Sequence, residues 1–237
     1  MSRMLRQVTA LALACIALAS CSGGASDPSP GAQPSDCPTV QIIGLRGQGQ
    51  SLDANGGLGT EVRLVSEELA DDVADLGPVR TTAIRHQSRL GGWDDYLEDV
   101  ADGRARLGSE IRSIVAACPD ALITVLGFSQ GSQIAQEELA DTELARHVDA
   151  LVLVGSPLRD SREPFMPVMF PGGIPSGEGR LAPGPDLGHL GTRTVAACIT
   201  GDAVCAGGSD DTIHREAYED PKVARAIADS AASLLRR

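Results

Sequence analysis

A Gly-x-Ser-x-Gly pattern, GFSQG, occupies residues 127–131 of the 237-residue chain. It follows the apolar run at 121–126 and precedes a helix-like stretch at 133–139. Between a strand and a helix this pattern is typical of a nucleophile elbow, in which a tight turn exposes the serine oxygen and the helix N-terminus favours developing negative charge. We therefore predict that Ser129 is a nucleophile. The alternative is a Gly-rich packing turn whose serine caps the helix.

A serine nucleophile needs a base, and the base needs a carboxylate that orients it. The chain has four His residues. His147 precedes an expected strand and so lies at the wrong end of a sheet, and His86 follows an edge strand; for these two we expect a solvent-facing side chain. His214, which lies between the last expected strand and the last helix, is the preferred base. His189, in a loop rich in Pro and Gly, is the second candidate.

The carboxylate candidate lies in the stretch CITGDAVC, residues 198–205. Asp202 follows the last expected strand in a Gly-Asp turn, and a Cys198–Cys205 bridge would close a short loop that fixes the position of this carboxylate. The alternative is an ordinary turn residue. A chain order of Ser, Asp and His is that of α/β-hydrolases.

Apolar, β-branched runs alternate with helical patterns along the chain. Strands are expected at 40–45, 80–84, 122–127, 148–154 and 193–199, and helices at 60–74, 94–117 (one helix, or two joined near Gly103), 132–144 and 221–235. The alternation predicts an α/β fold with a doubly wound, mostly parallel five-stranded sheet in the order 2-1-3-4-5. Ligands bind beyond the carboxyl ends of such strands, where Ser129, Asp202 and His214 are expected.

Six Cys are present, of which Cys15 and Cys21 lie near the N-terminus. The other four predict two disulfides in an exported domain, and three pairings are possible. On the expected strand order Cys37 and Cys118 precede neighbouring strands, at the end of the sheet away from the site. With Cys198–Cys205 formed, a Cys37–Cys118 bond would be purely structural.

The N-terminus has the pattern of a secretory signal: Arg3 and Arg6 precede an apolar stretch at 8–18. Residues 18–21, Leu-Ala-Ser-Cys, resemble the lipobox of bacterial lipoproteins, which implies cleavage before Cys21 and lipidation of its thiol. We expect a signal peptide at 1–20, a flexible tether at 21–36 and a hydrolase domain at 37–237. The alternative is a plain signal peptide with a coincidental Cys.

The chain is acidic, with a formal net charge of −12. Such a surface argues against nucleic acid and against anionic lipid headgroups as partners. We expect an exported monomer whose membrane contact comes from the lipid anchor at Cys21.

Four pieces of the sequence together resemble the cutinase family of serine esterases, and they span roughly residues 37–237. They are RGQGQ after the first expected strand, GFSQG, CITGDAVC and HREAY at 214–218. The Asp between two Cys, followed further on by a His, is far more specific than the Gly-x-Ser-x-Gly pattern alone.

The resemblance implies a cutinase-like α/β-hydrolase fold with Ser129 as nucleophile, Asp202 as orienting acid and His214 as base. It also implies an oxyanion hole formed by the backbone N–H of Gln130 and by Gln48, and requires no metal or organic cofactor. Gln48 departs from the family pattern, which has Ser or Thr at this position. Its side chain can still donate a hydrogen bond, but it is longer and less preorganised than a hydroxyl.

Residues 157–191 form a long segment that contains seven of the fourteen Pro and the apolar residues Phe165, Met166, Met169 and Phe170. The segment leaves the carboxyl end of the fourth expected strand, beside the site. One hypothesis is an apolar flap that binds acyl chains or gates entry. The other is a surface loop whose apolar residues pack on the body.

The resemblance suggests an ester substrate: a carboxylic ester of short or medium chain length, with lipids and polyesters included. An enzyme with the same residues could instead be a phospholipase or acyltransferase that acts on envelope lipids. A third hypothesis is a non-catalytic surface lipoprotein that keeps the fold and binds a ligand or a partner.

Overall fold

The computed structural model describes residues 36–237 of the protein. The predicted signal peptide, the lipidation site at Cys21 and the tether up to residue 35 lie outside the described residues. Within 36–237, no helix combines the length and the apolar composition needed to cross a membrane.

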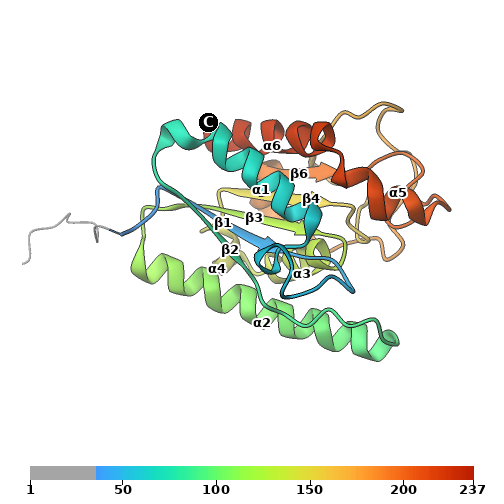
Figure 1. The fold of residues 1–237 in the computed structure, drawn as a ribbon, viewed down its shortest axis with the longest axis horizontal. Helices are drawn as coiled ribbons and strands as arrows, with labels where there is room; N and C mark the ends of the chain where they lie inside the picture. Colours follow the sequence, from blue (N-terminus) through green and yellow to red (C-terminus); the bar gives the residue numbers. More distant parts are fainter. Residues whose placement is uncertain (1–35) are drawn as a thin grey trace, which may run out of the picture. The chain divides into compact units, whose positions relative to one another are not determined.

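A parallel sheet forms the centre of the fold (Figure 1). Its strands are β1 (Val40–Leu45), β2 (Val79–Ala83), β3 (Leu122–Phe128), β4 (Ala150–Val154), β5 (Met166–Pro167) and β6 (Thr194–Ala197). They lie in the order β2-β1-β3-β4-β6-β5, and each neighbouring pair is parallel. The doubly wound parallel sheet and the order of the five expected strands are therefore confirmed.

The strand count differs from the prediction, because the 157–191 segment adds β5 to the edge beside β6. This strand has two residues, too few for any alternation to be visible in the sequence. Pro167 has no N–H to donate, and an edge strand tolerates that loss. The strand anchors the middle of the segment to the sheet.

Helices cover both faces of the sheet (Figure 1). They are α1 (Thr60–Asp72), α2 (Trp93–Ala117), α3 (Gln130–Glu138), α4 (Thr142–Ala145), α5 (Asp211–Glu216) and α6 (Pro221–Leu235), with short 3-10 turns at Asn55–Gly57, Ala74–Leu76, Gly188–Arg193 and Ala217–Glu219. Helices α1 and α6 pack together on one face, and α2 packs on α3 on the other. The short α5 lies beyond the carboxyl ends of the strands.

The central strands are buried on both faces, as expected for a parallel sheet between helices. In β4, Val152 belongs to the apolar cluster beneath α1 and α6, whereas Leu151 and Leu153 belong to the cluster beneath α2 and α3. All three side chains are at most 2% exposed. The two cores make the sheet a rigid platform for the loops at its carboxyl edge.

One helix differs from the sequence expectation, and for residues 94–117 the single-helix alternative is confirmed. The expected helix at 132–144 is two helices, because the Asp141 carboxylate accepts a hydrogen bond from the Glu143 N–H and starts α4. Helix α2 continues through Gly103 without interruption. A Cβ at Gly103 would lie 2.5 Å from Ile134 Cδ1, so this glycine allows the close packing of α2 on α3.

Both predicted disulfides are present. Cys37–Cys118 joins the chain ahead of the neighbouring strands β1 and β3. Cys198–Cys205 closes the loop that follows β6. The first bond lies at the amino ends of the strands and the second at their carboxyl ends, as the sequence indicated.

Candidate active site

Ser129 lies in a tight turn between β3 and α3 and has a positive φ of 52°, which is rare for a residue with a Cβ. A Cβ at Gly127 would lie 2.5 Å from the carbonyl carbon of Gly131, and one at Gly131 would lie 2.1 Å from the Leu45 oxygen. Only glycine therefore fits at either position. The Ser129 side chain makes no capping hydrogen bond to α3, so the helix-capping alternative is wrong.

His214, on α5, lies with its Nε2 atom 2.9 Å from Ser129 Oγ. The imidazole is buried and stacks on Phe128, with ring centroids 5.0 Å apart. Gly155 follows β4 with a φ of 57°, and a Cβ there would lie 2.9 Å from His214 Cε1. The glycine thus makes room for the ring beside the serine.

Asp202 is fully buried, and both of its carboxylate oxygens accept from His214 Nδ1, at 3.0 and 3.1 Å. The backbone N–H groups of Val204 and Cys205 donate to Oδ1 at 2.6 and 3.1 Å. Burial raises the pKa of this carboxyl, but its hydrogen bonds, with that from His214 the largest, outweigh burial and leave the pKa below its usual value. An ionised Asp202 keeps the proton on Nδ1, which leaves Nε2 free to accept from the Ser129 hydroxyl.

Tyr218 is a further member of this cluster that the sequence reasoning missed. Its hydroxyl donates to Asp202 Oδ2 at 2.8 Å and accepts from the Ile199 N–H at 3.0 Å. The side chain is fully buried, and burial raises the pKa of the phenol well above its usual value. Tyr218 lies four residues after His214, and this spacing places two helical residues on one face. The four-residue spacing is the sequence feature that could have indicated that Tyr218 belongs to the site.

The other histidines lie apart from Ser129. His189 is exposed, and His147 accepts a hydrogen bond from its neighbour Arg146. The expectation that His86 faces solvent is wrong, because its ring is 0% exposed. Burial, reinforced by the charge of Arg46, lowers the pKa of His86 to about 4.

The loop after β1 passes directly beside Ser129, since a Cβ at Gly47 would lie 3.4 Å from Ser129 Cβ. Gln48 comes next in this loop, and its side-chain Nε2 donates to the Arg89 carbonyl at 3.0 Å. Gln130 opens α3, where backbone N–H groups have no intrahelical acceptor. The Gln130 side-chain amide is buried with no hydrogen-bond partner among the described residues.

Gln50 fixes the geometry of this loop. Its Oε1 accepts from the Gly47 N–H at 2.7 Å, and its Nε2 donates to Glu61 Oε2 at 2.6 Å. Glu61 is 2% exposed, and burial raises its pKa. The side chains of Gln50 and Glu61 therefore connect the β1 loop to α1.

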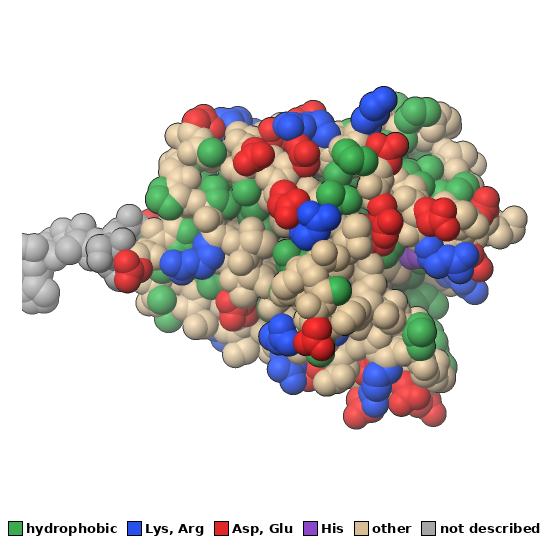
Figure 2. Space-filling model, in the orientation of Figure 1, with side chains coloured by type: hydrophobic (Ala, Val, Ile, Leu, Met, Phe, Trp, Pro, Cys, Tyr) green, Lys and Arg blue, Asp and Glu red, His purple; other side chains and the backbone are tan. Residues whose placement is uncertain are grey.

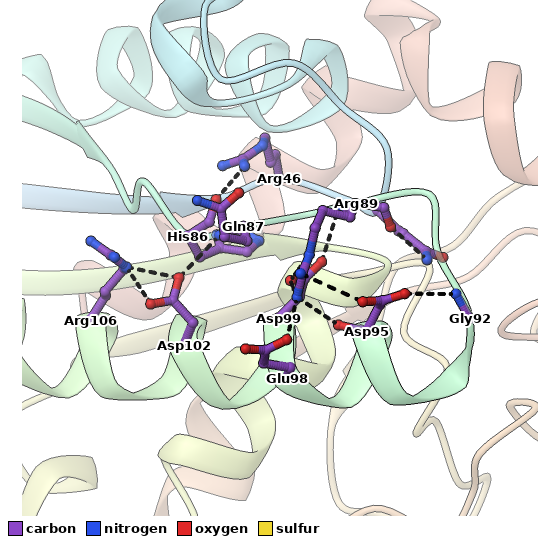
Figure 3. A network of polar contacts seen from close by, with 11 residues as sticks. Arg46, His86, Gln87, Arg89, Gly92, Asp95, Glu98, Asp99, Asp102 and Arg106 are labelled. Atoms are coloured by element: carbon purple, nitrogen blue, oxygen red, sulfur yellow. Dashed lines mark hydrogen bonds and ion pairs between the residues drawn. The ribbon is translucent and has the colours of Figure 1, made fainter.

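A polar network connects the loops after β1 and β2 to helix α2 (Figure 3). The buried Arg46 guanidinium donates to the carbonyl oxygens of Gln50, Ile84 and His86. Further along the second loop, Arg89 donates to the buried Asp99 of α2 through both its backbone N–H and its side chain. These bonds hold the Arg89 carbonyl where Gln48 reaches it.

A pocket of about 460 Å³ opens at Ser129. It is lined by Gln48, Gly91, Gly92, Trp93, Tyr96, Ser129, Pro157, Arg180, Leu181 and Val204. Trp93 and Tyr96 stack with ring centroids 5.3 Å apart, and the Tyr96 hydroxyl donates to Gln133. The start of α2 thus gives the pocket an aromatic wall.

Several residues of the 157–191 segment pack on the body. Val168 and Phe170 are buried in the cluster beneath α6, and Met169 between them is 66% exposed. The buried Arg159 guanidinium donates to the carbonyl oxygens of Pro175 and Gly177 within the segment and of Cys205 outside it. These contacts favour the packed surface loop over an apolar flap.

The fold and the site together define a class. A parallel sheet of this order, a serine in a strained strand–helix turn, and a histidine between that serine and a buried aspartate are the features of a serine α/β-hydrolase.

Comparison with known proteins gives the family. The family model described as Cutinase matches residues 36–232. The chain therefore belongs to the cutinase family, and its class is that of the serine carboxylic ester hydrolases.

Similar proteins agree with this family. Carboxylesterase Culp1 of Mycobacterium tuberculosis is 25% identical over 181 residues, which cover 75% of this chain and 73% of that protein. Cutinase CUT1 of Coprinopsis cinerea is 29% identical over 175 residues, 72% of each chain. The structure of a cutinase-like protein from Cryptococcus sp. matches with a TM-score of 0.67 at 19% identity, over 86% of this chain and 98% of that chain. The match to the Cryptococcus sp. structure shows that the two proteins share a fold.

Replacement of Tyr218 tests its support of Asp202. Tyr218→Phe removes a donor to the ionised carboxylate and leaves the Ile199 N–H without its acceptor. We expect the free energy of unfolding to fall by about 1–3 kcal/mol and the pKa of Asp202 to rise. Urea denaturation measures the first effect, and NMR titration of the Asp202 carboxyl carbon measures the second. Unchanged stability with an unshifted Asp202 titration would contradict this role.

The low pKa of His86 predicts that the folded protein loses stability in acid. The unfolded chain takes up a proton near pH 6.5 that the folded ring resists until about pH 4. Stability contributed by the neutral ring is therefore complete above pH 6.5 and declines as the pH falls towards 4, by about 3 kcal/mol in total. Urea denaturation of the wild type and His86→Gln at pH 7.5, 5.5 and 4.5 measures it. Parallel pH dependences of the two proteins would count against the prediction.

Proposed function

We propose that the protein is an exported serine esterase that hydrolyses carboxylic esters through Ser129, His214 and Asp202. The observation that carries the proposal is the 2.9 Å contact between Ser129 Oγ and His214 Nε2, with Asp202 on the other ring nitrogen. Family membership supports the same chemistry.

In this mechanism Ser129 Oγ attacks the ester carbonyl while His214 Nε2 takes its proton. The imidazolium is stabilised by the ionised Asp202, which does not itself take up the proton. His214 then donates the proton to the leaving alcohol, and an acyl group remains on Ser129. A water molecule that gives its proton to His214 hydrolyses this acyl-enzyme and restores the serine.

The oxyanion of each tetrahedral intermediate is held by the backbone N–H groups of Gln48 and Gln130. Two observations support this part of the proposal. The β1 loop passes beside Ser129 and is fixed by Gln50, and the side chain of Gln48 is bonded to the Arg89 carbonyl. Backbone donors on two braced elements need little reorganisation as negative charge develops.

Esters of short to medium chain length are the proposed substrates. The pocket at Ser129 has apolar and aromatic side chains along its walls, and the similar proteins include a carboxylesterase and a cutinase. Export is supported by the two disulfides. Anchoring through a lipid on Cys21 stays a proposal, based on the lipobox-like residues 18–21.

The nucleophile is tested with p-nitrophenyl esters from acetate to palmitate, alongside a fluorophosphonate label. We expect Ser129→Ala to lose at least about 10³-fold in kcat/KM and to lose the label. The control Ser109→Ala, an exposed serine of α2, should keep both. A folded wild type that neither labels nor hydrolyses any ester would instead favour a non-catalytic binding protein.

A further inference from the structure

Of the described residues that line the pocket at Ser129, only Arg180 is formally charged. It is exposed, and it belongs to the 157–191 segment, whose other pocket residues, Pro157 and Leu181, are apolar. The proposed chemistry does not use it. Arg180 therefore places a positive charge in the pocket that has no role in the proposed reaction.

The Arg180 guanidinium has no hydrogen bond or ion pair with any residue in the described part of the chain. Its neighbours in the same segment differ. Arg159 is bonded to three carbonyl groups, and Arg162 pairs with Asp160 through two nitrogen atoms. On the face shown in Figure 2, most Lys and Arg side chains lie beside acidic ones. In a chain with a formal charge of −12, Arg180 thus places an unpaired positive charge in the pocket at Ser129.

The backbone at Arg180 is fixed relative to the site. The Arg180 N–H donates to the Val204 carbonyl at 2.9 Å, next to the loop that holds Asp202. On either side, the Gly179 and Leu181 N–H groups donate to the carbonyls of Arg159 and Pro157, both at 2.8 Å. The side chain therefore extends from a braced backbone, and its five N–H donors have no acceptor among residues 36–237.

We propose that the pocket accepts esters that carry an anionic group, a carboxylate or a phosphate, in the same molecule as the ester, and that Arg180 binds this group. A guanidinium suits both groups, because its planar fork donates two parallel hydrogen bonds to either. The uncharged part of the substrate then contacts the apolar lining formed by Trp93, Tyr96 and Leu181. This inference rests on the proposed esterase function and deepens it by naming a substrate class.

The test compares two esters of nearly the same shape, 4-acetoxybenzoate, which is anionic, and 4-acetoxybenzamide, which is neutral. The readout is the ratio of kcat/KM for the anionic ester to that for the neutral one. We expect Arg180→Gln to lower this ratio about fivefold, the size typical of a partly exposed charge contact. Added salt should lower the ratio in the wild type and have less effect in the variant.

Two further variants separate charge from shape. Arg180→Lys keeps the cation and should retain most of the ratio. Arg162→Gln removes a different exposed arginine of the same segment, outside the pocket lining, and should leave the ratio unchanged.

A second pair of substrates identifies the source of the anion. It consists of a monoacylglycerol phosphate and the monoacylglycerol of equal chain length. A response of this pair alone to Arg180→Gln would assign the site to a lipid phosphate, whereas a response of both pairs would assign it to anionic esters in general. An unchanged ratio for both pairs, with hydrolysis still dependent on Ser129, would overturn this inference and leave the esterase intact. No hydrolysis of any ester by the folded protein would overturn both.

Discussion

The close crossing of β1, β3 and α3 at Ser129 is the constraint on which the rest of the site depends. Gly127 and Gly131 leave no space for a Cβ, and Ser129 itself takes a positive φ. Such a conformation costs about 1–3 kcal/mol and persists only where its surroundings enforce it. The enforcement comes from a sheet buried on both faces. The same crossing brings the β1 loop, and with it Gln48, next to the serine.

Burial of Asp202 sets a second constraint, because a carboxylate without contact with water needs donors for its lone pairs. His214, Tyr218 and the backbone of the 198–205 loop provide them. The bonds that make burial tolerable also fix the tautomer and the orientation of the imidazole. The same contacts thus support both stability and chemistry in this cluster. The Cys198–Cys205 disulfide closes the loop that carries Asp202.

The strands and their order could be predicted because buried parallel strands are apolar runs separated by helical patterns. The sequence could also predict that Ser129, Asp202 and His214 lie close together, because the carboxyl ends of those strands share one edge of the sheet. The burial of His86, the bond from Gln48 to the Arg89 carbonyl and the exposure of Arg180 could not be predicted. Each depends on contacts between loops far apart in the sequence, and no local pattern encodes these contacts. Strand β5 could not be predicted either, because its two residues are too few for any alternation to be visible in the sequence.

Trapping of the acyl-enzyme identifies the nucleophile directly. The protein is mixed with p-nitrophenyl butyrate and quenched in acid, and its peptides are mapped by mass spectrometry. We expect a butyryl group on the peptide that contains Ser129, and on no other peptide. A butyryl group on another residue, or turnover without any adduct while Ser129→Ala remains active, would contradict it.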